Sequence, residues 1–232
     1  MWNSRLKNKI ERLYGKAYFD RMDALSWKRK RRAIGKYEKQ FLQLLNASTN
    51  DKILDVGCGT GWHIFHYGYQ CRFVVGIDIS KEGLKRASRR LKTLKKHSNV
   101  QLIRGSVEKL PFCKDSFNKV LCVSLIEHVE QPKSSLLETR RVLVKNGFIV
   151  IGTPNRLDPL YETLQFIADK THKKMPIIGY PDKTHRKLFT LPTLKALFRA
   201  CGFYITHVKV QYSLLGMKTF GGDFVVSAVK TK

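Results

Sequence analysis

The chain has 232 residues, 43% of them hydrophobic, which suits one large α/β domain or a domain with small additions and needs no disulfide or metal. Its 44 Lys/Arg and 18 Asp/Glu give a formal net charge of +26. A charge this high predicts attraction to nucleic acid, an anionic membrane surface or a phosphorylated substrate, but excludes no fold.

The five cysteines and the first residues of the chain bear on the cellular compartment in which we expect the protein. The cysteine number is odd and no C-x-x-C pair occurs, so we expect reduced thiols and no metal site. The first residues lack the apolar core of a signal peptide, and no stretch approaches 18 apolar residues. We therefore expect a cytoplasmic protein, with peripheral contact to a membrane left open.

Residues 1–50 form a basic N-terminal region that we expect to be helical. It carries thirteen Lys/Arg and four Asp/Glu, with its densest charge at residues 28–32. Apolar residues from Ile34 to Leu45 recur at helical spacing, which predicts a packed helix before residue 50.

From residue 51 on, strand and helix patterns alternate. Helical patterns cover residues 84–94 and 134–143, and short apolar strands are expected at residues 53–56, 73–77, 100–103, 120–125 and 148–152. Strands separated by helices predict βαβ units and a mostly parallel sheet. We therefore expect an α/β domain over residues 51–232, with helices on both faces of the sheet.

This alternation stops after Pro154. Residues 155–189 are predicted to be an insertion with a helix near residues 160–168. Thr190 is placed to cap a following helix that Gly202 ends. Two final strands, at residues 204–210 and 224–229, predict an antiparallel pair at the edge of the sheet.

The most informative segment is residues 53–61, with the sequence ILDVGCGTG. A buried strand leads into a glycine-rich turn, where the backbone can adopt positive φ and approach a ligand closely. The N–H groups of the next helix point toward the same place. Open α/β sheets bind ligands at such a strand end.

Two further observations narrow the choice of cofactor. The dinucleotide pattern is G-x-G-x-x-G, whereas Trp62 stands where its last glycine would be, which disfavours NAD. Asp78 ends the second strand, where a carboxylate can hold both hydroxyls of a ribose.

The chain resembles the class I S-adenosylmethionine-dependent methyltransferases. The resemblance rests on ILDVGCGTG (53–61), VVGIDIS (74–80), GSVEKLPF (105–112), FNKVLCVSLIEHVEQP (117–132) and GFIVIGTPN (147–155), in the order of the family. It implies a Rossmann-like, doubly wound, seven-stranded sheet that is mostly parallel with an antiparallel last strand. It also implies that Asp55 and residues 57–61 surround the methionine part of S-adenosylmethionine, with Asp78 on the ribose.

The adenine end of the implied cofactor site departs from the family pattern. Ser106 stands where the family usually has an Asp, so its hydrogen bond to adenine would be weaker. Val107 is expected to offer backbone contact, and Ser124 to lie near the transferred methyl. The candidate cofactor-binding residues are Asp55, Gly57, Cys58, Gly59, Gly61, Asp78, Ile79, Ser106, Val107 and Ser124.

Candidate catalytic residues follow from the need to deprotonate an acceptor. Histidine is the usual base, and His128 lies just beyond the fourth strand, preceded by Glu127. The alternative is that Glu127 and His128 only orient this turn. His185 lies in a segment, THRKLFT, that resembles one closing over the substrate in this family.

Residues 155–189 bear a second resemblance, to the ubiquinone-biosynthesis O-methyltransferase branch, through TPNR (153–156), Met175-Pro176 and THRKLF (184–189). It implies a lipid-linked or other amphipathic acceptor facing His128 and His185.

Three functions stay open at this point. The first is methylation of a small-molecule or lipid-linked acceptor, on oxygen. The second is methylation of RNA, held by the basic surface. The third is a cofactor-binding or scaffold protein without catalysis.

Overall fold

The computed structural model describes residues 9, 10, 12–20, 36–93, 98–155, 185–214 and 217–231. The basic run at residues 28–32 and the expected helix at residues 160–168 lie outside these residues. Among the described helices, none combines the length and the apolar character needed to cross a membrane.

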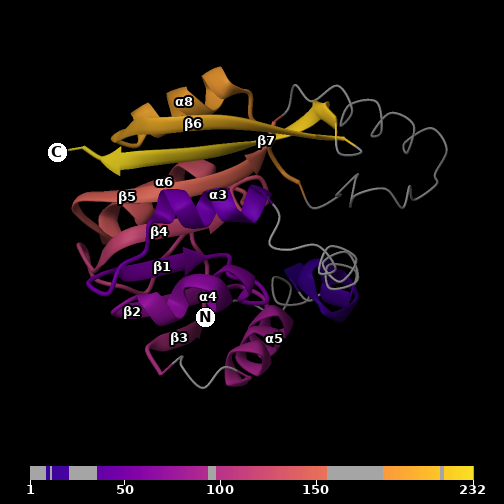
Figure 1. Cartoon of the computed structure of the whole chain (residues 1–232), viewed down its shortest axis with the longest axis vertical. Helices are drawn as coiled ribbons and strands as arrows, with labels where there is room; N and C mark the ends of the chain where they lie inside the picture. The colour runs from indigo at the N-terminus through magenta and orange to yellow at the C-terminus, as the bar shows by residue number, and fades with distance from the viewer. Residues whose placement is uncertain are drawn as a thin grey trace.

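Seven strands form one sheet in the order β3-β2-β1-β4-β5-β7-β6 (Figure 1). The strands are β1 (Lys52–Val56), β2 (Phe73–Asp78), β3 (Val100–Arg104), β4 (Phe117–Val123), β5 (Leu143–Pro154), β6 (Phe203–Leu214) and β7 (Met217–Lys230). The first five are parallel, and β7 is antiparallel to both β5 and β6. The predicted doubly wound sheet with its antiparallel last strand is confirmed.

Helices cover both faces of the sheet. On one face, residues of α3 (Lys36–Leu45), α4 (Trp62–Tyr67) and α5 (Lys81–Lys92) pack with Ile53, Val74 and Leu121. On the other, α6 (Pro132–Val142) and α8 (Leu191–Ala200) pack with Leu54, Val120 and Ile149. Neighbouring residues of one strand thus enter opposite cores, as the period of two requires. A short 3₁₀ helix, η1 (Gly68–Gln70), follows α4.

The predicted start of α8 is confirmed in detail. The Thr190 side chain accepts a hydrogen bond from the backbone N–H of Thr193, and the Thr193 side chain accepts one from the backbone N–H of Thr190, which completes a capping box. Gly202, with φ of 70°, follows the helix.

Several strand boundaries differ from the sequence prediction: β6 runs to Leu214 and not to residue 210, and β7 begins at Met217 and not at residue 224. The fourth strand was expected at residues 120–125, but β4 ends at Val123 because Ser124 has a φ of 51°, outside the strand region. The fifth strand begins five residues earlier than expected, at Leu143, because a register irregularity between Phe117 and Lys119 lets β4 and β5 pair on both sides of a bend.

Candidate active site

The site lies where the carboxyl ends of β1 and β4 meet in the middle of the sheet. These two strands are parallel neighbours, and the chain leaves each of them for a loop at the same edge. The β1 loop carries the three glycines, and the β4 loop leads through Ser124 to Glu127 and His128. This is the topological switch point at which such sheets bind ligands.

The glycine loop has the backbone shape that its sequence predicted. Gly57, Gly59 and Gly61 have φ of 71°, 49° and 69°. A Cβ on Gly57 would lie 2.9 Å from Leu125 Cδ1, and one on Gly61 would lie 3.0 Å from Ala87 Cβ. The loop therefore depends on glycine both for its φ values and for space.

Asp55 is a buried carboxyl at the end of β1. Only 2% of the residue is exposed, and Tyr67 donates a hydrogen bond to its Oδ2 over 3.3 Å. Burial raises the pKa of Asp55 to about 8, with the Tyr67 hydrogen bond acting in the opposite direction. A buried carboxylate of this kind is stabilised when a cation binds beside it. The ammonium and sulfonium groups of S-adenosylmethionine fit this requirement.

Asp78 is held rigidly at the end of β2. Its Oδ2 accepts from the N–H of Gly59 over 2.8 Å, and its Oδ1 accepts from the N–H of Ser80 over 2.7 Å. Burial raises the pKa of Asp78, while these backbone hydrogen bonds oppose the rise. Each carboxylate oxygen keeps a second lone pair, so the side chain can still accept from a pair of ribose hydroxyls.

The other candidate cofactor residues lie around the same edge. Ile79 directly follows Asp78, and Cys58 is buried in the loop with a pKa raised well above its usual value by burial. Ser106 uses its Oγ to accept from the N–H of Glu108 over 3.2 Å, and Val107 is buried. The Ser106 hydroxyl thus already accepts a hydrogen bond within its own turn. A hydrogen bond from this residue to adenine stays a prediction.

The structure brings Glu127, His128 and His185 together. The two imidazole rings have centroids 4.8 Å apart, and His128 Nε2 lies 3.9 Å from Glu127 Oε1. One ligand atom from each of the three residues lies within 4.8 Å of the others.

Glu127 anchors this group from within the core. The residue is fully buried, and its Oε2 accepts from Thr153 Oγ1 over 3.1 Å. Its backbone carbonyl accepts from the N–H groups of Arg186 and Lys187, which fixes the segment that carries His185. These hydrogen bonds help to hold His185 next to His128.

Sequence reasoning missed the contribution of residues 9, 10 and 12–20, called here the N-terminal helical segment. Lys9 forms an ion pair with Glu130, and the Tyr14 ring meets the His128 ring edge-on at 6.1 Å. The Tyr14 carbonyl accepts from Ser80 Oγ, and the buried Phe19 side chain lies against Gly59 and Gly83. The segment therefore runs from the His128 loop across to the glycine loop. The aromatic sequence Tyr-Gly-Lys-Ala-Tyr-Phe was the available signal.

Comparisons with known proteins agree with this geometry. Residues 54–151 match the model of a family described as a methyltransferase domain. A demethylmenaquinone methyltransferase from Staphylococcus saprophyticus is 29% identical over 194 residues, which cover 75% of this chain and 78% of that protein. A tRNA U34 carboxymethyltransferase from Colwellia psychrerythraea is 31% identical over 155 residues, which cover 65% and 44%.

The fold is also found among solved structures. A SAM-dependent methyltransferase from Methanosarcina mazei superposes with a TM-score of 0.63 at 20% identity, and the match covers 79% of this chain and 94% of that one. For three of the curated relatives, the matched part is 36%, 53% and 44% of their length. The family match over residues 54–151, the strand order and the glycine loop agree: this chain contains a class I S-adenosylmethionine-dependent methyltransferase domain.

Proposed function

We propose that this protein transfers a methyl group from S-adenosylmethionine to an oxygen of a small-molecule or lipid-linked acceptor. The observation that carries the proposal is the pair of imidazole rings, 4.8 Å apart, beside the loop that follows β4. An oxygen acceptor loses a proton as it gains the methyl group, and a histidine ring nitrogen is suited to accept that proton near neutral pH.

Each residue has a separate task in this proposal. Bound S-adenosylmethionine would supply an electrophilic methyl group on a sulfonium centre. Asp55 and the glycine loop hold its methionine part, and Asp78 its ribose. One ring of the His128–His185 pair takes the acceptor proton, and Glu127 holds both rings in position. Tyr14, from the N-terminal helical segment, lies edge-on against the His128 ring, which helps to exclude water.

The acceptor class is tested by comparing extracts of cells that make the wild-type protein or the Asp55→Ala/Asp78→Ala variant. We expect a metabolite or lipid with the added mass of one CH₂ group only with the wild type. Calorimetry with S-adenosylmethionine on both purified proteins should give binding only for the wild type. Absence of binding by the wild type would refute the proposal at its first step, and bound cofactor without any methylated product would favour a non-catalytic role.

RNA is the second candidate acceptor. Its support is the net charge of +26 and the similarity to a tRNA U34 carboxymethyltransferase. Binding of structured RNA and of anionic vesicles is compared across salt concentrations, since phosphate contacts weaken steeply as salt rises. Saturable RNA binding without vesicle binding, together with methylated nucleosides in the RNA extract, would replace the first candidate with this one.

A further inference from the structure

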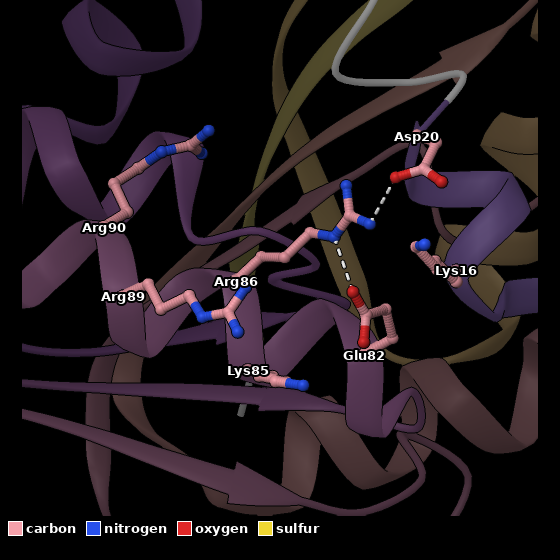
Figure 2. A pocket seen from close by; sticks show the side chains of 7 residues that line it. All are labelled: Lys16, Asp20, Glu82, Lys85, Arg86, Arg89 and Arg90. Atoms are coloured by element: carbon pink, nitrogen blue, oxygen red, sulfur yellow. Dashed lines mark hydrogen bonds and ion pairs between the residues drawn. The ribbon is translucent and has the colours of Figure 1, made fainter.

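A cavity of about 570 Å³ lies between the N-terminal helical segment and α5 (Figure 2). Seven of the residues that the structure describes line it, and all seven are charged: Lys16, Asp20, Glu82, Lys85, Arg86, Arg89 and Arg90. The volume is in the range of small-ligand pockets, but such pockets are mostly apolar. A lining in which every described residue is charged therefore indicates a highly charged ligand.

The two acidic residues of the lining share one basic partner. Arg86 forms ion pairs with Asp20 over 2.7 Å and with Glu82 over 2.8 Å, as Figure 2 shows. Lys16, Lys85 and Arg89 make no ion pair in the part of the chain that the structure describes. Five basic and two acidic residues leave a net charge of +3 at this cavity, so its cations repel one another, which a bound anion would relieve.

The lining also distinguishes between kinds of anion. A membrane-surface site pairs basic residues with apolar side chains that enter the lipid, and no apolar residue of the described chain lines this cavity. Single-stranded nucleic acid binds along grooves with aromatic platforms, and none of the lining residues that the structure describes is aromatic. A small compound with phosphate groups needs only cations, and arginine and lysine bind phosphate through charge-assisted hydrogen bonds.

Both walls of the cavity include elements that contact the glycine loop. Arg90, in its wall, donates to the carbonyl and the hydroxyl of Thr60 over 2.9 and 2.8 Å. On the opposite wall, Lys16 and Asp20 belong to the segment whose Phe19 rests on Gly59. An anion held between the two walls would keep that segment closed over the glycine loop.

We propose that this cavity binds a small phosphorylated anion through Lys16, Lys85 and Arg89, and that the bound anion strengthens cofactor binding by holding the N-terminal helical segment against α5. The site is separate from the acceptor site, so the proposal does not depend on which acceptor is methylated.

The first test is calorimetric titration of the full chain with inorganic pyrophosphate. The wild type should bind one equivalent saturably, and Lys85→Gln/Arg89→Gln should weaken binding about tenfold or more. The matched control is Lys81→Gln/Lys92→Gln, which removes the same charge from exposed positions of α5 outside the cavity. The control should change affinity by less than about threefold, because only screened, distant charges are lost. Thermal melting checks that both variants fold.

Equal weakening in the two double variants, or no saturable binding, would overturn the site. So would structured RNA or phosphatidylglycerol vesicles that bind tightly at the same residues while pyrophosphate fails to compete, because the occupant would then be a polymer or a membrane. None of these measurements requires methyl transfer, so they stand even where the proposed acceptor is wrong.

The second test measures S-adenosylhomocysteine affinity with and without saturating pyrophosphate. We expect about a fivefold or larger increase in the wild type, as is common for coupled sites, and no increase in Lys16→Gln. An unchanged affinity in the wild type would contradict the closing role.

Discussion

Arg90 and Thr60 tie the basic helix α5 to the glycine loop. Arg90 Nη1 donates to both the carbonyl and the hydroxyl of Thr60, while its guanidinium lies 5.2 Å from the ring centroid of Trp62. A charge-assisted donor thus fixes the residue between Gly59 and Gly61, whose φ values shape the loop. The positive charge of α5 includes one residue that supports the cofactor loop directly.

Replacing Arg90 should therefore weaken cofactor binding. Arg90→Ala removes two hydrogen bonds from a charged donor, and we expect a loss of about 1.5–3 kcal/mol in binding, about tenfold or more in affinity. Calorimetry with S-adenosylhomocysteine measures the change, with the exposed Lys92→Ala as the control on the same helix. An Arg90→Ala affinity equal to that of Lys92→Ala would show that the loop keeps its shape without this contact.

Asp55 should make cofactor binding depend on pH. Burial raises its pKa to about 8, and a bound cation must lower it, so a proton is released on binding. Affinity should therefore rise from about pH 6 to about pH 7.5, below the range where the ligand's own amino group loses its proton. Asp55→Asn should bind more weakly and with a flat pH dependence. If cofactor affinity of the wild type did not change with pH, Asp55 would not be a buried carboxyl that is protonated in the free protein.

The same carboxyl should lower the stability of the free protein at high pH. Its folded pKa lies above the unfolded value, so its contribution is favourable when it is protonated and is lost as pH rises toward about 8. Asp55→Asn keeps a side chain of nearly the same shape that cannot ionise. Above about pH 8, the variant should melt a few degrees higher than the wild type, and the difference should shrink near pH 5. A lower melting temperature at both pH values would contradict this explanation.

The local parts of the site were predictable from sequence. The glycine loop, the strand-ending Asp78 and the Thr190 cap each depend on residues close together in the chain, where φ preferences and capping chemistry decide the structure. The contacts made by Tyr14 and Phe19 were not, because they join the N-terminal helical segment to residues far along the chain. The same holds for Thr153 and Glu127, which only the pairing of β4 with β5 brings together.

The two histidines should affect turnover more than cofactor binding. His128→Asn or His185→Asn should lower kcat on the identified acceptor by about a hundredfold if either ring takes the proton, while S-adenosylhomocysteine affinity stays within about twofold. His207→Asn, at an exposed position of β6, is the matched control. The double variant should lose little more than the more damaging single variant, because the pair acts as one unit. Additive losses would instead assign the rings independent roles.

Thr153 should be needed for stability through the buried Glu127. Thr153→Val removes the hydroxyl that donates to Glu127 Oε2 and should lower the free energy of unfolding by about 1–3 kcal/mol. Thr153→Ser keeps the hydroxyl and should recover much of that loss. Urea denaturation measures both. If the serine variant were as unstable as the valine variant, the lost methyl packing and not the hydrogen bond would be the cause.

Alanine substitutions at Gly59 and Gly61 should separate the cost of backbone strain from the cost of steric crowding. Both have positive φ, but a Cβ on Gly59 would meet Phe19 Cε1 at an ordinary 3.7 Å, whereas one on Gly61 would lie 3.0 Å from Ala87 Cβ. Gly59→Ala should therefore cost only the strain of the left-handed conformation, about 1–2 kcal/mol. Gly61→Ala should cost about 1–3 kcal/mol more, because α5 must shift away from the loop. Urea denaturation without cofactor measures both variants, and equal losses would mean that α5 yields freely to the added methyl group.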